Sequence, residues 1–317
     1  MFSKEAEQKM QGHSPRELAW RRFKSNKVAI PSLALAIFVV LSVLLAPVIY
    51  GLLHIDPDFR DMTTIDERGE VIGDIGGISW KHPFGVVPGL GYDTLARMLF
   101  GARVSFLIAL AATAVTVFLG LFFGILGGYF RGKVDGVIGR FTDFLLAFPQ
   151  FFMILALSAP LVDRIQRSGI AHDNDARILY LILIFSIFGW PYLSRIIRSQ
   201  VISIRERDFV LSARALGASN FRILVKEVLP NVWTPIIIYV SLSLPGYLTA
   251  EAVFSYLGIG VQPPTPTLGV IISDSTHYMM NDSTYFFIPS LTLILLVLIF
   301  NLLGDALRDA LDPKSEA

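Results

Sequence analysis

The sequence contains no cysteine and little charge. Only 17% of its 317 residues are charged, whereas about 25% is usual for a soluble globular domain. The absence of cysteine excludes disulfides, cysteine nucleophiles and thiolate metal sites. A chain that is 53% hydrophobic, with its apolar residues gathered in long runs, is predicted to be an integral membrane protein. The net charge of +1 gives no indication of a nucleic-acid partner.

Motifs for catalysis and nucleotide binding are also missing. The five histidines show no metal-ligand spacing, and no G-x-x-x-x-G-K-[ST] loop occurs. The long apolar runs contain no acid or base, which disfavours an intramembrane enzyme and a secondary transporter driven by buried carboxylates. Glu251 is the nearest candidate, and we interpret it as an interfacial carboxylate at the outer end of a helix. The energy for any transport would then come from a partner.

Seven uncharged runs are at least 17 residues long, and a spanning helix needs roughly 20 apolar residues. Six of them are predicted to span the membrane: 28–50, 104–130, 144–162, 178–194, 228–250 and 283–304. The seventh, 252–273, contains two glycines and three prolines near its centre, so it is predicted to be a loop or re-entrant segment packed against protein. The expected fold is an all-α membrane protein with six transmembrane helices and both termini on one side.

The distribution of lysine and arginine predicts which side that is. Nineteen of them lie in the four segments 1–27, 131–143, 195–227 and 305–317, and eight lie in 51–103, 163–177 and 251–282. The positive-inside rule therefore places both termini and loop 195–227 in the cytoplasm. The expected organisation is a cytoplasmic amphipathic segment 1–27, a first span 28–50, an extracytoplasmic segment 51–103, a helical core 104–310 and a cytoplasmic tail 311–317.

Three shorter patterns carry local predictions. The stretch "SPRELAWRRFKSN" (14–26) is typical of an amphipathic helix capped by Ser14, whose basic residues reach lipid phosphates, or of a solvated basic flank that only sets topology. The stretch "TTIDERGEVIG" (63–73) predicts two short extended pieces around a turn. Glycines at 120, 124 and 128 predict close helix–helix packing.

The pattern of the cytoplasmic loop 195–227 predicts two helices separated by a break. Asp208 is predicted to cap a helix that continues through Ala213, Arg214 and Leu216. Gly217 suits a terminating position with positive φ, and Ser219, after Ala218, offers a second cap. Such a small-residue surface suits insertion into another protein's groove, while an ordinary basic loop is the alternative that the residues leave open.

The stretch "LSARALGASNFRILVKEVLP" (211–230) resembles the EAA loop of permease subunits in binding-protein-dependent ABC importers. Ala213, Gly217, Leu229 and Pro230 match that motif, whereas Leu211, Ser212 and Glu227 depart from it. Further resemblance lies in "HPFG" (82–85), "GGYFRGKVDGVIGRFTDFLLAFPQF", "FSYLGIGVQPPTPTLGVII" and "FNLLGDALRDALDPK". After "HPFG" the family's pattern is altered to "VVPGLGYDTLARM", where Asp93 and Arg97 are candidates to serve instead. The most similar group is the C-type permease of dipeptide and oligopeptide importers.

This resemblance implies a type I importer permease fold in a bacterial inner membrane, with residues 104–310 as the permease core. It implies four further partner chains: a second homologous permease, two ATPase subunits and an extracytoplasmic substrate-binding protein. The chain itself would be no enzyme and hold no cofactor, because ATP and magnesium would be bound by the ATPase subunits. The helix near 208–221 would dock into an ATPase, with Asp208, Ala213, Arg214, Leu216, Gly217 and Ala218 as the coupling residues. Peptides are the expected cargo, and nickel chelates or another small solute are the alternative.

Overall fold

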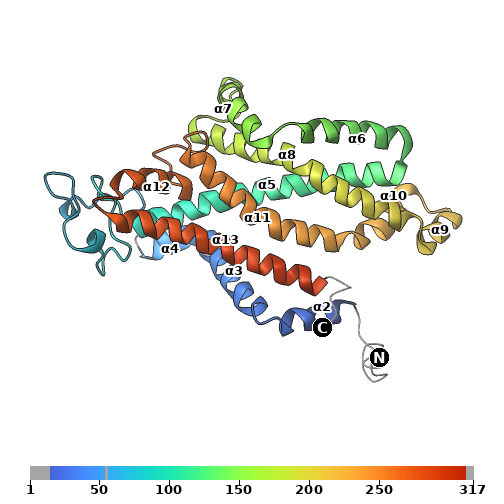
Figure 1. The fold of residues 1–317 in the computed structure, drawn as a ribbon, viewed down its shortest axis with the longest axis horizontal. Helices are drawn as coiled ribbons and strands as arrows, with labels where there is room; N and C mark the ends of the chain where they lie inside the picture. Colours follow the sequence, from blue (N-terminus) through green and yellow to red (C-terminus); the bar gives the residue numbers. More distant parts are fainter. Residues whose placement is uncertain (1–14, 54–55, 312–317) are drawn as a thin grey trace.

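The computed structural model describes residues 15–53 and 56–311, so the Ser14 cap lies outside the described residues. These parts form a bundle of helices without a named strand (Figure 1). The helices are α2 (Pro15–Ser25), α3 (Ala29–Leu44), α4 (Ala46–Leu53), α5 (Thr94–Phe130), α6 (Gly132–Ala147), α7 (Gln150–Arg167), α8 (Asp173–Arg205), α9 (Asp208–Ala215), α10 (Asn220–Ile223), α11 (Trp233–Tyr256), α12 (Leu268–Ser275) and α13 (Ser283–Leu311). Short turns are η1 (Met62–Thr64), η2 (Ile75–Gly77), η3 (Leu224–Val228), η4 (Leu229–Asn231) and η5 (Thr276–Tyr278).

Four helices, α5, α8, α11 and α13, are long and apolar enough to cross a membrane. Two bent pairs raise the number to as many as six: α2 with α3, which meet at 95°, and α6 with α7, which meet at 87°. The all-helical prediction therefore agrees with the structure. The expected span 144–162 is not one straight helix, because the chain bends at Phe148 and Pro149 between α6 and α7. Proline lacks the backbone donor that a continuous helix needs.

The centre of the bundle is the pair α5 and α8, which make the most extensive contact between two elements. At about 1.5 Å per residue, 37 and 33 residues give rods of roughly 55 and 50 Å. The hydrocarbon core of a bilayer is only about 30 Å thick. Both helices therefore project beyond the membrane and reach the structures at its two faces.

Glycines of α5 allow the close approach to α8. A methyl group added at Gly120 would lie 2.8 Å from the Leu193 side chain, and one at Gly124 would lie 2.8 Å from Ile197. At Gly128 it would lie 2.8 Å from Val201. These separations are shorter than carbon atoms tolerate, so the predicted packing role of the three glycines is confirmed.

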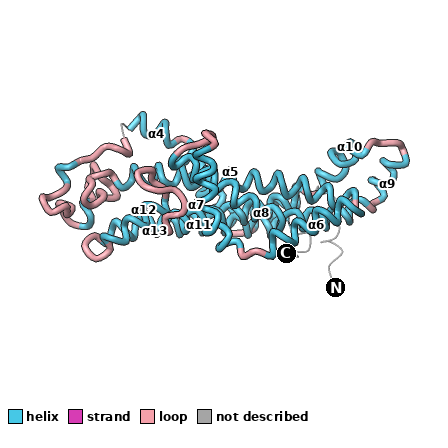
Figure 2. Tube along the Cα trace, turned by 90° about the horizontal axis from the view of Figure 1, so that it is seen from above, coloured by secondary structure: helices cyan, strands magenta, loops and turns pink. Residues whose placement is uncertain are grey.

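The remaining helices surround this pair. Helix α11 packs on α5 and α13, and α13 also packs on α2, α3 and α12. The segment around η1 and η2 lies at one end of the bundle, and α9 lies at the opposite end, in both Figure 1 and Figure 2. Helix α2 and the C-terminal end of α13 are nearer to the α9 end. The fold thus has two distinct functional ends joined by α5 and α8.

Two local predictions are settled by the structure. In 63–73, Ile65 and Val71 form an antiparallel bridge on either side of the predicted turn, whereas Thr63 and Thr64 belong to the helical turn η1 and not to an extended piece. In 252–273, the chain leaves the helix after Tyr256 and passes the prolines without regular structure. The second half of that run then forms α12, which the sequence did not predict because the preceding prolines masked its short apolar pattern.

Candidate coupling loop, central cavity and outer cluster

The loop between α8 and α11 is folded onto the end of the α5–α8 pair. Val210, Ile223 and Val228 are fully buried and pack with Val201 and Ile204 of α8 in one apolar cluster. Ala213 and Ala218 are partly buried against the same cluster. A loop with such a core is held in a fixed position, because opening it would expose several apolar side chains.

The helix ends within this loop agree with most of the predicted local signals. Gly217 has φ of 82°, and Ser219 accepts a hydrogen bond from the Arg222 backbone N–H at 3.3 Å. The prediction for Asp208 was wrong: Arg207 is the N-cap, and Asp208 is the first helical residue of α9 without a side-chain cap. An acidic residue there still interacts favourably with the positive end of the helix dipole.

The exposed tip of the loop carries three large apolar side chains among polar and charged ones. Leu216 is 88% exposed and Phe221 is 76% exposed, and Leu211 beside them is also exposed. Gly217, Arg214 and Asp208 are exposed as well, whereas Ala213 and Ala218 contribute mainly to the loop's own packing. Large apolar side chains exposed on a packed support favour a contact surface for another protein. Leu211 and Phe221 were not among the predicted coupling residues.

Tyr129, near the end of α5, fastens the loop to the bundle. Its hydroxyl donates to Asn220 Oδ1 at 2.9 Å and accepts from Arg214 Nη2 at 3.3 Å. Arg205 donates to the Tyr129 carbonyl oxygen at 2.5 Å. The guanidinium groups of Arg205 and Arg214 lie 5.9 and 5.7 Å from the centre of the tyrosine ring, which is a cation–π distance. No local pattern in the sequence indicates this role, because the partners are separated by 76 to 91 positions.

Salt bridges tie α6 to the same end of α8. Asp135 accepts from Arg198 Nη2 at 2.6 Å and also from its Nε. Arg195 pairs with Asp143, one helical turn nearer to the middle of α8. A bidentate arginine–carboxylate contact fixes the relative orientation of the two side chains as well as the distance between them. These ion pairs join α6 to α8 near the end of α8 that carries the loop.

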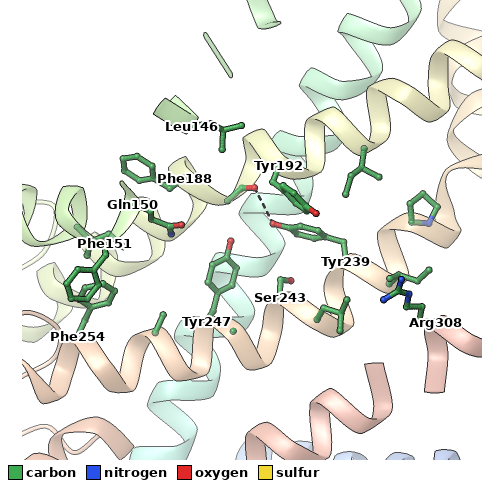
Figure 3. Close-up of a pocket in the computed structure, with 18 residues that line it drawn as sticks. Leu146, Gln150, Phe151, Phe188, Tyr192, Tyr239, Ser243, Tyr247, Phe254 and Arg308 are labelled. Carbon is green, nitrogen blue, oxygen red and sulfur yellow. Dashed lines mark hydrogen bonds between the residues drawn. The ribbon is translucent and has the colours of Figure 1, made fainter. Parts of the chain in front are cut away.

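A cavity of about 1060 Å³ opens between α7, α8 and α11 (Figure 3). Its lining is mainly apolar and aromatic, and Arg308 is the one charged side chain among its lining residues. Tyr239 donates to the Gly189 carbonyl oxygen at 3.2 Å across it, while the Tyr247 hydroxyl lies 3.0 Å from that of Thr116. This lining offers stacking surfaces and a few hydroxyls, and it contains no acid that could bind a cation.

A cluster of ionisable side chains lies at the N-terminal end of α5, at the end of the bundle opposite α9. Asp93 Oδ1 accepts from the Ala96 N–H at 2.7 Å, and Asp93 Oδ2 lies 2.7 Å from His82 Nδ1. His82 Nε2 lies 3.4 Å from Asp61, which also accepts from Lys81 at 2.5 Å. The Lys81 ammonium holds the pKa of the Asp61 carboxyl well below its usual range. His82 is thus a buried packing residue of this cluster.

Tyr92 and Arg97 join the outer segment to the loop after α11. The Tyr92 ring lies between the guanidinium groups of Arg60 and Arg97, at 4.8 and 4.6 Å from its centre. Arg97 also donates to the Pro264 carbonyl oxygen at 3.4 Å. Asp93 and Arg97, the two candidate residues in the stretch after "HPFG", therefore have different roles. Asp93 caps α5, and Arg97 connects the outer segment to the loop after α11.

Glu251 lies in the last turns of α11 but is completely enclosed by protein, which corrects its interpretation as an interfacial group. Ser255 Oγ donates to Glu251 Oε1 at 2.7 Å and accepts from the Val261 N–H at 3.1 Å. Through Oε1 the carboxyl group therefore helps to hold the proline-containing loop against α11. Its other oxygen, Oε2, is buried without a hydrogen-bond partner among the described residues, so the cost of burying this group is only partly offset.

The residues that the structure describes contain no group of three or more histidine, aspartate or glutamate side chains that could hold a metal ion.

Comparison with known families gives two matches. The profile of binding-protein-dependent transport system inner membrane components matches residues 116–316. The profile of the N-terminal TM domain of oligopeptide transport permease C matches residues 14–64. Together they cover most of the chain in the order that the sequence motifs predicted.

Similar curated proteins align over nearly their whole length. The oligopeptide transport system permease protein OppC of Mycobacterium tuberculosis (strain ATCC 25618 / H37Rv) is 34% identical, with 96% of each chain covered. The dipeptide transport system permease protein DppC of Alkalihalophilus pseudofirmus is 32% identical over 96% of this chain and 91% of that protein. The glutathione transport system permease protein GsiD of Pectobacterium atrosepticum is 33% identical over 93% of this chain and 90% of that protein.

Among solved structures, the inward-facing MetNI methionine ABC transporter contains a chain of similar fold. The TM-score is 0.54 at 17% sequence identity, and the match covers 69% of this chain and 96% of that chain. This likeness confirms the predicted type I importer permease fold.

We expect Tyr129→Phe to loosen the loop without unfolding the bundle. The variant keeps the ring and loses the hydroxyl that bonds Asn220 and Arg214, and such a hydrogen bond contributes about 1 kcal/mol. Amide hydrogen exchange across 206–222 should therefore become roughly fivefold faster. Tyr256→Phe is the matched control, since that exposed ring is remote from the loop. Unchanged exchange in Tyr129→Phe would contradict the fastening role.

Proposed function

Because the chain belongs to the family of binding-protein-dependent transport system inner membrane components, we propose that it forms half of an ATP-driven path for importing di- or oligopeptides. The observation that carries the coupling role is the exposed apolar tip of a loop whose base is buried on α8. A second homologous permease would complete the path, and an extracytoplasmic binding protein would deliver the cargo. Two ATPase subunits would supply the energy, so ATP and magnesium would be bound outside this chain.

The proposed coupling surface consists of Asp208, Arg214, Leu216 and Gly217 on α9 and its end, together with Leu211 and Phe221. The apolar tip would enter a cleft of an ATPase subunit, while Arg214 keeps its contact with Tyr129. A rotation of the docked loop would be transmitted to α5 through Tyr129 and to α8 through the buried cluster. Ala213 and Ala218 would support this surface from beneath, through their packing.

The central cavity between α7, α8 and α11 is the proposed contribution of this chain to the path. Its aromatic lining accommodates varied side chains, and its single cation does not match both charged ends of a peptide. Selectivity would then lie mainly in the binding protein. Relatives named for oligopeptide, dipeptide and glutathione transport support a peptide as the cargo more than a metal chelate.

The proposed topology places both termini and α9 in the cytoplasm of a bacterial cell and the 51–103 segment outside. Its support is the excess of lysine and arginine, 19 against 8, on the segments assigned to the inside. The location of α9 and the η1–η2 segment at opposite ends of the bundle is consistent with it.

We expect Leu216→Asp to weaken association with the ATPase subunits. Docking would bury the exposed leucine, which is worth about 1.5–3 kcal/mol, so its loss should weaken binding at least tenfold. Co-purification of the assembled importer from detergent measures this directly. Ile170→Asp is the matched control, because Ile170 is 73% exposed between α7 and α8. Undiminished association of Leu216→Asp, or equal loss in both variants, would count against the coupling surface.

Labelling of introduced cysteines tests the topology, because the chain has no cysteine of its own. A membrane-impermeant maleimide applied to intact spheroplasts should label Ile170→Cys. It should label Leu216→Cys only after the membrane is permeabilised. The reverse pattern would invert the proposed orientation.

A peptide titration tests where selectivity lies. The purified full chain without its partners should show no saturable binding of a dipeptide at micromolar concentrations. The assembled importer with its binding protein provides the positive control. Micromolar affinity in the isolated chain would refute the assignment of selectivity to the binding protein.

A further inference from the structure

A second groove, of about 800 Å³, lies away from the central cavity, between α2, α3, the start of α11 and the end of α13. Its walls are formed by Trp20 and Phe23 of α2, Leu33 of α3, and Leu303 and Leu307 of α13. Phe23 is buried at its base, whereas Trp20 is half exposed at its rim. The groove is therefore an apolar channel with an aromatic edge.

The direction of α2 places this groove at the membrane surface. Helix α2 meets α3 at 95°, so when α3 runs through the bilayer α2 lies nearly parallel to its plane. An amphipathic helix in this orientation inserts its apolar face at the boundary between headgroups and acyl chains. Trp20 at the rim is typical of that depth.

The polar side of α2 is basic. Residues 17–27 contain Arg21, Arg22, Lys24 and Lys27 against the single acid Glu17. Arg22 lines the groove, and Lys24 lies 5.0 Å from the centre of the Trp20 ring. Asp305 and Asp309 on α13 are the acids on the neighbouring helix, so the positive charge is concentrated on the α2 side.

We propose that this groove binds an anionic phospholipid. One acyl chain lies between α2 and α13 along Leu303 and Leu307, and the phosphate group faces Arg21, Lys24 and Lys27. The occupant is a lipid because the groove is mainly apolar, with Arg22 among its lining residues, and the exposed cations Arg21, Lys24 and Lys27 lie on or directly after the same helix. Each basic residue near an anionic headgroup contributes about 1 kcal/mol, or roughly a fivefold preference. The bound lipid fixes the angle between α2 and the bundle.

Native mass spectrometry of the full chain and of the assembled importer tests this proposal. The protein is incubated with equal amounts of phosphatidylglycerol and phosphatidylcholine that have the same acyl chains. We expect retention of phosphatidylglycerol to exceed that of phosphatidylcholine at least about fivefold. The triple variant Arg21→Gln, Lys24→Gln, Lys27→Gln should lose this preference, and Leu307→Trp should lower retention of both lipids by filling the channel.

The triple variant Lys133→Gln, Arg140→Gln, Lys226→Gln removes the same charge from exposed positions outside the groove, and it should retain the preference. Equal retention of both lipids by the unaltered chain would overturn the proposal, as would the same loss in both triple variants. If Leu307→Trp instead releases the second permease subunit without changing lipid retention, a protein occupies the groove and the proposal is wrong. Near-ultraviolet circular dichroism of each variant confirms that its helices remain packed.

Discussion

The structure depends on the close contact between α5 and α8 at Gly120, Gly124 and Gly128. In a membrane, apolar side chains gain little by leaving lipid for protein, so helix pairing relies on dense packing and hydrogen bonds. The three glycines let Leu193, Ile197 and Val201 fill the space that side chains of α5 would otherwise occupy. The other helices and both peripheral structures are arranged on this pair.

Because α5 and α8 are longer than the bilayer is thick, one rigid unit carries a distinct structure at each end. At one end Asp93 caps α5 and bonds His82 in the outer cluster. At the other end Tyr129 of the same helix fastens the exposed loop. Packed and hydrogen-bonded elements thus connect the loop with the opposite face, and the proposed coupling would act through them.

The proposed roles of the central cavity and the exposed loop rest on different physical features. The cavity is lined by aromatic and apolar side chains and offers no buried acid for a proton or cation. The loop offers an apolar tip on a rigid base. Glu251, the fully buried acid of α11, holds the adjacent loop through a hydrogen bond from Ser255 to one of its two carboxyl oxygens. Movement driven by a partner's ATP is consistent with each of these features.

The sequence by itself determined the membrane class, most of the spanning segments, the glycine contact and the break at Gly217, because apolar run length and local backbone preference are short-range properties. The sequence also identified the protein family, because several family motifs occur in it in the expected order. Tertiary structure alone decided the bend at Phe148, the roles of Tyr129 and Arg97, the burial of Glu251, and which loop residues are exposed. The roles of Tyr129, Arg97 and Glu251 depend on partners far apart in the chain, so no local pattern encodes them. The bend at Phe148 has a local cause in Pro149, but the sequence did not show whether this proline would bend the span. Asp208 illustrates how far a helix start can be located from the sequence alone. Aspartate suits the N-cap position, but in the structure Arg207 is the N-cap and Asp208 is the first helical residue.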